Sequence, residues 1–129
     1  MIIRVYYEDT DTGGIVYHSN YLNFCERARS DAFFQRGLTP VLACGHFVAR
    51  KVVAEYFSSA KLGDLLDVKT SLIKMSGASF VLLQTIYKND AKIFELQITL
   101  AYIDFSGNVQ KIDSATKELI LSLFKVCWI

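Results

Sequence analysis

Residues 6 to 21 read YYEDTDTGGIVYHSNY, and the rest of the chain is organised around them. The stretch holds two aspartates, a Gly13-Gly14 pair and one of the two histidines, between an apolar segment and a long helical pattern. Glycine takes backbone angles that other residues avoid, so the pair predicts a tight turn. Ser19 or Asn20 is a suitable N-cap for the following helix. The stretch therefore predicts a loop that connects a strand to a helix.

The segments on either side of this loop agree with that interpretation. Ile2–Tyr7 is rich in β-branched and aromatic residues, which favours a short strand. A helix is expected to run to about Arg36, because Gly37 is a typical helix stop and Pro40 follows it. Apolar residues recur at three- and four-residue steps and form one stripe; they are Tyr21, Phe24, Cys25, Ala28, Ala32 and Phe33.

Farther along the chain, the apolar period changes to two, which is typical of strands. Strands are expected over residues 47–58, 66–75, 80–87 and 93–103, and a last helix from Asp113 or Ser114 to about Phe124. In the first of these strands, four residues are expected mostly on one face: Val48, Val52, Ala54 and Tyr56. The order of elements predicts an α+β fold, in which one long helix lies across an antiparallel sheet.

Composition indicates one domain, residues 1–129, with a substantial hydrophobic core. Hydrophobic residues make up 52% of the chain, which is well above the content of disordered chains. The formal net charge of +1 gives no electrostatic reason to bind nucleic acid or an anionic membrane surface. No apolar run approaches the length of a membrane span.

The three cysteines, Cys25, Cys44 and Cys127, are widely spaced and include no C-x-x-C pair. This pattern argues against both a disulfide framework and a zinc site. Reduced thiols are typical of cytosolic proteins, and the first four residues show no signal-peptide pattern. We therefore expect a cytoplasmic protein without a metal ion.

The loop also suggests chemistry at the start of the helix. The first N–H groups of a helix lack internal partners and lie at its positive end, where they can stabilise a developing negative charge. Asp9 and Asp11 lie just upstream, and His18 lies beside the helix start. A carboxylate there can act as a base or a nucleophile toward a carbonyl group. The alternative is that these residues serve only as a cap and a turn.

A longer pattern gives the loop more weight. It runs from Arg4-Val5 through Thr10-Asp11, Gly14-Ile15-Val16 and His18 to Tyr21. This pattern resembles the signature of the 4-hydroxybenzoyl-CoA thioesterase family. The runs Glu26-Arg27-Ala28-Arg29, Val53-Ala54-Glu55-Tyr56 and Ala60-Lys61-Leu62-Gly63-Asp64 look like the YbgC branch of acyl-CoA thioesterases.

The resemblance implies a hotdog fold, in which a five-stranded antiparallel sheet wraps a long central helix and a short C-terminal helix follows. It implies hydrolysis of acyl-CoA to free acid and CoA, with no cofactor. Asp11 matches the catalytic aspartate, as nucleophile or general base. The backbone N–H of His18 matches the oxyanion donor, and its imidazole could also transfer a proton. The residues implied to shape the substrate pocket are Tyr7, Gly14, Tyr17, Asn20 and Tyr21.

The resemblance also implies a homo-oligomer. Family members pair by extending the sheet, with each site at the interface, and are often dimers of dimers, so a homotetramer is expected. The pocket wall is expected to draw on five aromatic residues, namely Tyr7, Phe24, Phe47, Phe57 and Phe80.

Other points stay open at this stage. The founding family member binds the CoA phosphates with a basic turn, which here is Ser76-Gly77-Ala78; the candidate cations are Lys74, Arg50, Lys51 and Lys61. The carrier could be CoA or the phosphopantetheine arm of acyl carrier protein. A partner role in phospholipid or envelope machinery is the alternative function. A hotdog dehydratase is disfavoured, since the prolines that should follow His46-Phe47 are absent.

Overall fold

The segment before the loop forms a shorter strand than the sequence predicts. In the computed structural model, which describes residues 1–129, β1 spans Ile2–Arg4 and Tyr7–Asp9 form a 3-10 turn, η1. The carboxylate of Asp9 accepts a hydrogen bond from the Tyr6 N–H at 2.9 Å. This contact folds the backbone back on itself, so the extended conformation ends before the turn.

Four long strands and β1 form an antiparallel path in the order β1-β3-β4-β5-β2. The predicted five-stranded antiparallel arrangement is therefore confirmed. A two-residue strand, β6, Lys125–Val126, adds a short parallel pairing to β3. The long strands are β2, His46–Tyr56; β3, Leu65–Met75; β4, Ser79–Lys88; and β5, Ala91–Ile103.

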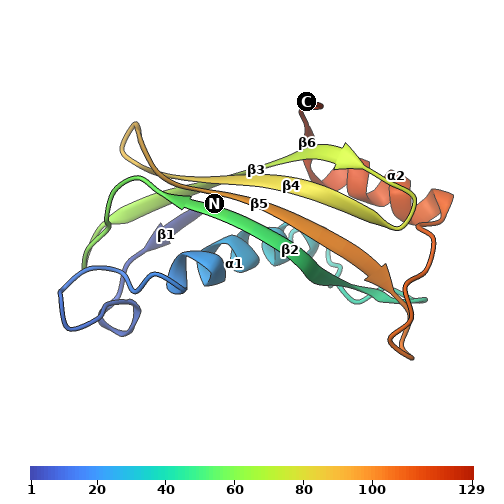
Figure 1. Ribbon diagram of the computed structural model, residues 1–129, viewed down its shortest axis with the longest axis horizontal. Helices are drawn as coiled ribbons and strands as arrows, with labels where there is room; N and C mark the ends of the chain where they lie inside the picture. The colour runs from blue at the N-terminus through green and yellow to red at the C-terminus, as the bar shows by residue number, and fades with distance from the viewer.

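The long helix α1, Asn20–Phe34, lies along the inner face of the curved sheet (Figure 1). It begins after Ser19, as predicted, although the Ser19 side chain makes no capping hydrogen bond. The helix ends at Phe34, and Gly37, whose φ of 70° lies in the left-handed region, turns the chain away from it. The predicted helix is confirmed, and its last turn ends two residues earlier than expected.

The core fills the space between α1 and the sheet. Alternate strand residues face α1 and are buried; they include Leu66, Val68, Leu72, Leu82, Ile86, Phe94, Leu96 and Ile98. The apolar stripe of α1 covers them with Tyr21, Phe24, Cys25, Ala28 and Phe33. The two-residue period of the sequence thus identifies the inward face of the central strands correctly.

A β-bulge in β2 overturns one expectation about faces. Arg50 has no partner in the β2–β5 register. Before it, Val48 pairs with Ala101 on the outer face, whereas Val52, after it, pairs with the inward residue Ile98. Ala54 and Tyr56 pair with the inward residues Leu96 and Phe94, so the predicted common face is confirmed for Val52, Ala54 and Tyr56. It is wrong for Val48, because one extra residue moves every later side chain to the other face.

The short helix α2, Ser114–Leu123, covers one end of the core, at the opposite end of the sheet from the η1 loop (Figure 1). Its cap is the predicted one, since the Asp113 carboxylate accepts a hydrogen bond from the Thr116 N–H at 2.7 Å. Just after the helix, the Phe124 ring packs against Phe33 and Phe80. The helix thereby closes the far end of the space under the sheet.

Candidate active site

Asp9 fixes the shape of the loop that precedes α1. It is only 4% exposed, and its two carboxylate oxygens accept hydrogen bonds from the Tyr6 N–H and from Nδ2 of Asn20, the latter at 2.7 Å. Its carbonyl accepts a further bond from the Tyr17 N–H. Both Asp9 and Asn20 therefore serve the fold of the loop.

Asp11, in contrast, is exposed, and only one of its two carboxylate oxygens accepts a hydrogen bond. Its Oδ1 accepts a hydrogen bond from the Gly13 N–H at 2.8 Å, and its Oδ2 has no partner in the chain. A side chain on residue 13 would crowd this oxygen at 3.1 Å. Gly14 completes the turn with a φ of 78° and donates its N–H to the Asp11 carbonyl. The two glycines thus orient the carboxylate and leave one oxygen free.

The start of α1 presents free N–H groups beside this carboxylate. The N–H groups of His18 and Ser19 donate to no acceptor in the chain. The peptide at His18 is held in place, because its carbonyl accepts a hydrogen bond from the Tyr56 hydroxyl at 2.7 Å. The Tyr17 ring lies 4.5 Å from the His18 ring, between centroids. A fixed, unpaired N–H at a helix start is suited to stabilising an anion.

Asp11 and His18 line one hollow of about 290 Å³. Its other lining residues are Ile15, Val16, Tyr21, Tyr56, Phe57, Ser58 and Ser59. The Tyr21 hydroxyl accepts a hydrogen bond from the Ala60 N–H at 3.0 Å, and burial raises the pKa of Tyr21. Tyr21 is therefore a fixed, neutral wall of this hollow.

A second hollow adjoins the first at Asp11. Tyr7, Gly14 and Asp11 line it together with Thr10, Thr12 and Leu62. Of the predicted site residues, the structure thus groups Asp11 with His18 and Tyr21 on one side, and with Tyr7 and Gly14 on the other. Tyr17 and Asn20 line neither hollow. No three histidine, cysteine or carboxylate side chains gather closely enough to hold a metal ion.

Sequence reasoning missed Tyr56 as a site residue. Its hydroxyl reaches the His18 carbonyl from the end of β2, across the start of α1. The available signal was its place in the run Val53-Ala54-Glu55-Tyr56, directly before the expected wall residue Phe57. Of the expected pocket-wall residues, Phe57 lines this hollow, whereas Phe24 is fully buried in the core.

The other two expected wall residues, Phe47 and Phe80, line a separate cavity of about 160 Å³. It lies between the second half of α1 and the first half of β2. Its further lining residues are Glu26, Arg29, Ser30, Phe33, Pro40, Ala49, Leu100 and Phe124. Arg29 donates a hydrogen bond to Oε1 of Gln84 at 2.9 Å, and burial lowers the pKa of its guanidinium. Within one chain, this largely apolar cavity is separate from Asp11.

Comparisons with known proteins find thioesterases among the relatives of this chain. A YbgC acyl-CoA thioesterase of Helicobacter pylori is 47% identical over 87 residues, which cover 67% of this chain and 65% of that relative. A YbgC acyl-CoA thioester hydrolase of Escherichia coli is 38% identical over 108 residues, with 79% of each chain covered. A probable thioesterase from Bartonella henselae superposes with a TM-score of 0.82 at 28% identity, covering 88% of this chain and 97% of that one. The expected hotdog fold is confirmed.

The first of these alignments spans just under two thirds of the Helicobacter relative's length. The sequence profile of the thioesterase superfamily matches residues 13–94. This range contains the glycine turn, α1, and the strands from β2 to the beginning of β5. The chain therefore belongs to the thioesterase superfamily.

Proposed function

We propose that this chain is an enzyme that hydrolyses acyl-CoA thioesters to free acid and CoA. The observation that carries the proposal is the pairing, in one hollow, of a carboxylate with a free oxygen and an unpaired N–H at a helix start. Relatives that are 38% and 47% identical bear the names acyl-CoA thioester hydrolase and acyl-CoA thioesterase, which supports the same reaction here.

In the proposed reaction, Asp11 acts through Oδ2 in one of two ways. It attacks the thioester carbonyl to form a mixed anhydride, which water then hydrolyses, or it accepts a proton from the water that attacks directly. In both routes the carbonyl oxygen becomes negative, and the His18 N–H donates to it. The C–S bond breaks, and the thiolate takes up a proton. We propose that the exposed imidazole of His18 supplies that proton.

The test is the activity of Asp11→Asn on a panel of short, long and aromatic acyl-CoAs and on acyl carrier protein thioesters. We expect kcat to fall by at least about 100-fold, the usual effect of losing a general base. Asp90→Asn, on an exposed hairpin, is the control and should keep full activity. Full activity in Asp11→Asn would contradict the proposal. Turnover of carrier-protein thioesters alone would favour the alternative carrier.

The enzyme is further proposed to be a homo-oligomer with sites between copies. β2 is an 11-residue edge strand that pairs only with β5. It exposes Val52 (43%) and Val53 (51%), and an exposed apolar edge favours pairing with another strand. Two copies related by a twofold axis would pair β2 antiparallel to β2. The start of one β2, at Phe47, would then lie beside the end of the other, at Tyr56.

Such pairing would set the apolar cavity of one copy beside the Asp11 hollow of the other. An acyl thioester needs both an apolar site and a reactive site, so the arrangement explains how a small chain completes its pocket. Val52→Glu should disrupt the pair in light scattering and lower activity, while Val109→Glu, in an exposed loop, should change neither. An intact, active oligomer of Val52→Glu would contradict this interface. A dimer of such dimers, a homotetramer, is proposed on the family pattern.

A cytoplasmic location is also proposed. All three cysteines are free, and Cys44 and Cys127 are exposed, a state typical of reducing compartments. No helix has the length and apolar character needed to cross a membrane. Fractionation of cells that express the tagged protein would test the location.

A further inference from the structure

Two serines, Ser58 and Ser59, line the hollow that contains Asp11 and His18, and the proposed reaction leaves them without a role. Both serines are exposed. The side-chain hydrogen bonds at the end of β2 and in the loop after it involve other residues, at positions 56, 60 and 61, so both serine hydroxyls are free. Free polar groups beside a reactive carboxylate are candidates for contact with the reacting molecules.

The backbone that carries these hydroxyls is held on both sides. The Ser58 N–H donates a hydrogen bond to the Ile93 carbonyl at 3.2 Å. Ala60, which is fully buried, donates its N–H to the Tyr21 hydroxyl at 3.0 Å and accepts a bond from the Val16 N–H at 2.8 Å. Because the backbone is fixed, each serine oxygen moves only by rotation about χ1. The segment therefore presents two preorganised polar groups to the hollow.

An antiparallel bridge brings the serine segment beside the start of α1. Ile15 pairs with Lys61 in this bridge. In an antiparallel pair, each step forward along one segment corresponds to a step back along the other. Three steps from the bridge, Ser58 is opposite His18, whose N–H is the proposed oxyanion donor. This register agrees with the presence of both residues in the lining of one hollow.

Asp11 approaches the hollow from the other side of the Ile15 segment. The Asp11 N–H donates a hydrogen bond to the Ile15 carbonyl at 3.0 Å. Two interstrand spacings, about 10 Å in total, therefore separate the backbones of Asp11 and the serine segment. The hollow between them has a volume of about 290 Å³, and a water molecule occupies about 30 Å³. A carbonyl group and a water thus fit between the carboxylate and the serine hydroxyls.

A water molecule that attacks a carbonyl needs a second hydrogen-bond partner besides the base. The free oxygen of Asp11 accepts one water proton and fixes only that O–H direction. A second acceptor fixes the other O–H, so that a lone pair of the water points at the carbonyl carbon. The two tyrosine hydroxyls of the hollow are already engaged, Tyr56 with the His18 carbonyl and Tyr21 with the Ala60 N–H. The two serines supply the uncommitted hydroxyls.

We propose that Ser58 and Ser59 are positioning residues that hold the attacking water opposite Asp11, a role that rests on the proposed hydrolysis. In the direct route, the water oxygen bonds to the acyl carbon, one water proton passes to Asp11, and the C–S bond breaks to release a thiolate, which takes a proton from His18. In the anhydride route, the water attacks the acyl carbon bound to Asp11 and the C–O bond to Asp11 breaks. The water proton then passes to the His18 imidazole, which has already protonated the thiolate. In both routes a serine hydroxyl accepts the second O–H of the water.

The test is the steady-state kinetics of Ser58→Ala, Ser59→Ala and the double variant on an acyl-CoA that the unaltered protein hydrolyses. We expect kcat of the double variant to fall by at least about 10-fold, the usual scale for one lost hydrogen bond, with KM and melting temperature unchanged. Replacing both serines with threonine keeps the hydroxyls and should restore most of kcat. Ser114→Ala, at the exposed first residue of α2, is the matched control and should keep full activity. Equal kcat in the double variant and the control would overturn the proposal, and so would a rise in KM alone.

Competition between water and hydroxylamine gives a readout that a merely structural defect would not change. Hydroxylamine attacks the acyl carbon through its own nitrogen, forms a hydroxamate and does not require the held water. After subtraction of the enzyme-free reaction, the double alanine variant should form at least about 10-fold more hydroxamate per acid than the unaltered protein. An unchanged ratio would contradict the water site. Absence of hydrolysis by the unaltered protein would overturn the proposed function together with this role, whereas an active unaltered protein with unaffected serine variants would overturn this role alone.

Discussion

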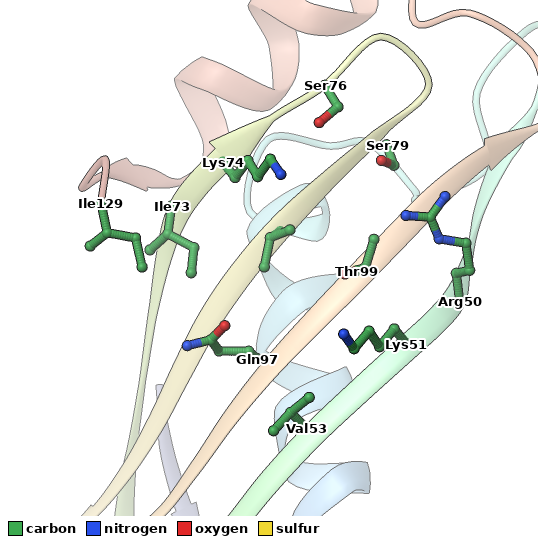
Figure 2. A pocket seen from close by; sticks show the side chains of 11 residues that line it. Arg50, Lys51, Val53, Ile73, Lys74, Ser76, Ser79, Gln97, Thr99 and Ile129 are labelled. Carbon is green, nitrogen blue, oxygen red and sulfur yellow. The ribbon is translucent and has the colours of Figure 1, made fainter.

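Gln84 on β4 and Gln97 on β5 lie on opposite faces of the same sheet, and the protein uses them in opposite ways. Gln84 is fully buried; it accepts a hydrogen bond from Arg29 and donates to the Cys25 carbonyl and the Thr70 hydroxyl. Gln97 is exposed on the outer face, in a hollow that Arg50, Lys51 and Lys74 also line (Figure 2), and it makes no side-chain hydrogen bond. The inner glutamine joins α1 to the sheet, and the outer one has no structural partner.

The loop before α1 repeats this contrast over two residues. Asp9 is buried with both carboxylate oxygens paired, whereas Asp11 is exposed with Oδ2 unpaired. A buried polar group must be satisfied, because an unpaired one costs about 1–3 kcal/mol. Polar groups that the fold satisfies therefore maintain structure, and those that it leaves free and gathered mark surfaces for binding or chemistry. This distinction can be tested by mutation on both sides.

The largest expected effect on stability is that of Gln84→Ala. It leaves the buried Arg29 guanidinium, the Cys25 carbonyl and the Thr70 hydroxyl without their partner, so the free energy of unfolding should fall by about 3 kcal/mol. Gln97→Ala removes the same type of side chain from the outer face and should change the free energy of unfolding by less than about 0.5 kcal/mol. Urea denaturation of both variants provides the measurement. Equal losses of unfolding free energy in the two variants would contradict the proposed difference between the two faces.

The next effect is expected in the loop. Asp9→Asn keeps the size of the side chain but replaces one carboxylate oxygen with an NH2 group. This new donor would face another donor, either the Tyr6 N–H or the Asn20 side-chain amide. We expect a loss of about 2 kcal/mol, the cost of an unsatisfied buried group. Asp11→Asn should stay within about 0.5 kcal/mol of the unaltered protein while losing activity. Thermal melts and initial rates, measured on the same preparations, would show whether structure and chemistry divide between the two aspartates.

The sequence predicts the elements of this fold well, because its periodicity is strong. The stripe of α1 and the alternation of residues 93–103 both follow from the need to bury one face. The bulges at Arg50 in β2 and Ile73 in β3 could not be predicted, since nothing in the local sequence distinguishes an extra residue from a regular strand. As a result, the sequence offers Arg50, Lys51 and Lys74 as separate candidates and gives no reason to group them.

The candidate site is predictable in part for a similar reason. Asp11 and His18 lie on one continuous loop, so their proximity follows from the turn at Gly13-Gly14 and the helix start. The contact from the Tyr56 hydroxyl to the His18 carbonyl joins residues 38 positions apart, and only tertiary packing brings them together. The partners of Asp9, in contrast, lie on the same loop and at the start of α1, at Tyr6, Tyr17 and Asn20. Local sequence thus identifies Asp11, the proposed reactive group, but not its distant supporting contact from Tyr56.

A smaller effect concerns Cys25, which is buried beside Gln84. Burial raises the pKa of its thiol from 9.0 to about 12. Between these values the unfolded chain loses the proton and the folded chain keeps it, so this contribution to stability is complete below pH 9 and declines as pH rises. The stability difference between the unaltered protein and Cys25→Ala should shrink by about 1.4 kcal/mol per pH unit above 9. Urea unfolding at pH 8, 9 and 10 would measure it; a constant difference would contradict this account.

The smallest effect tests the outer face. Because Lys51 and Lys74 lack acidic partners and line one hollow on the outer face with Arg50, each should be slightly repelled by the other two cations. Lys51→Gln should therefore raise the free energy of unfolding by about 0.5 kcal/mol at low salt, and the gain should vanish when salt screens the charges. Lys88→Gln is the opposite case, since the Lys88 amine pairs with Asp64 at 2.9 Å and its loss should lower stability slightly. Lys51→Gln that is less stable than the unaltered protein at low salt would instead place Lys51 among the groups that maintain the fold.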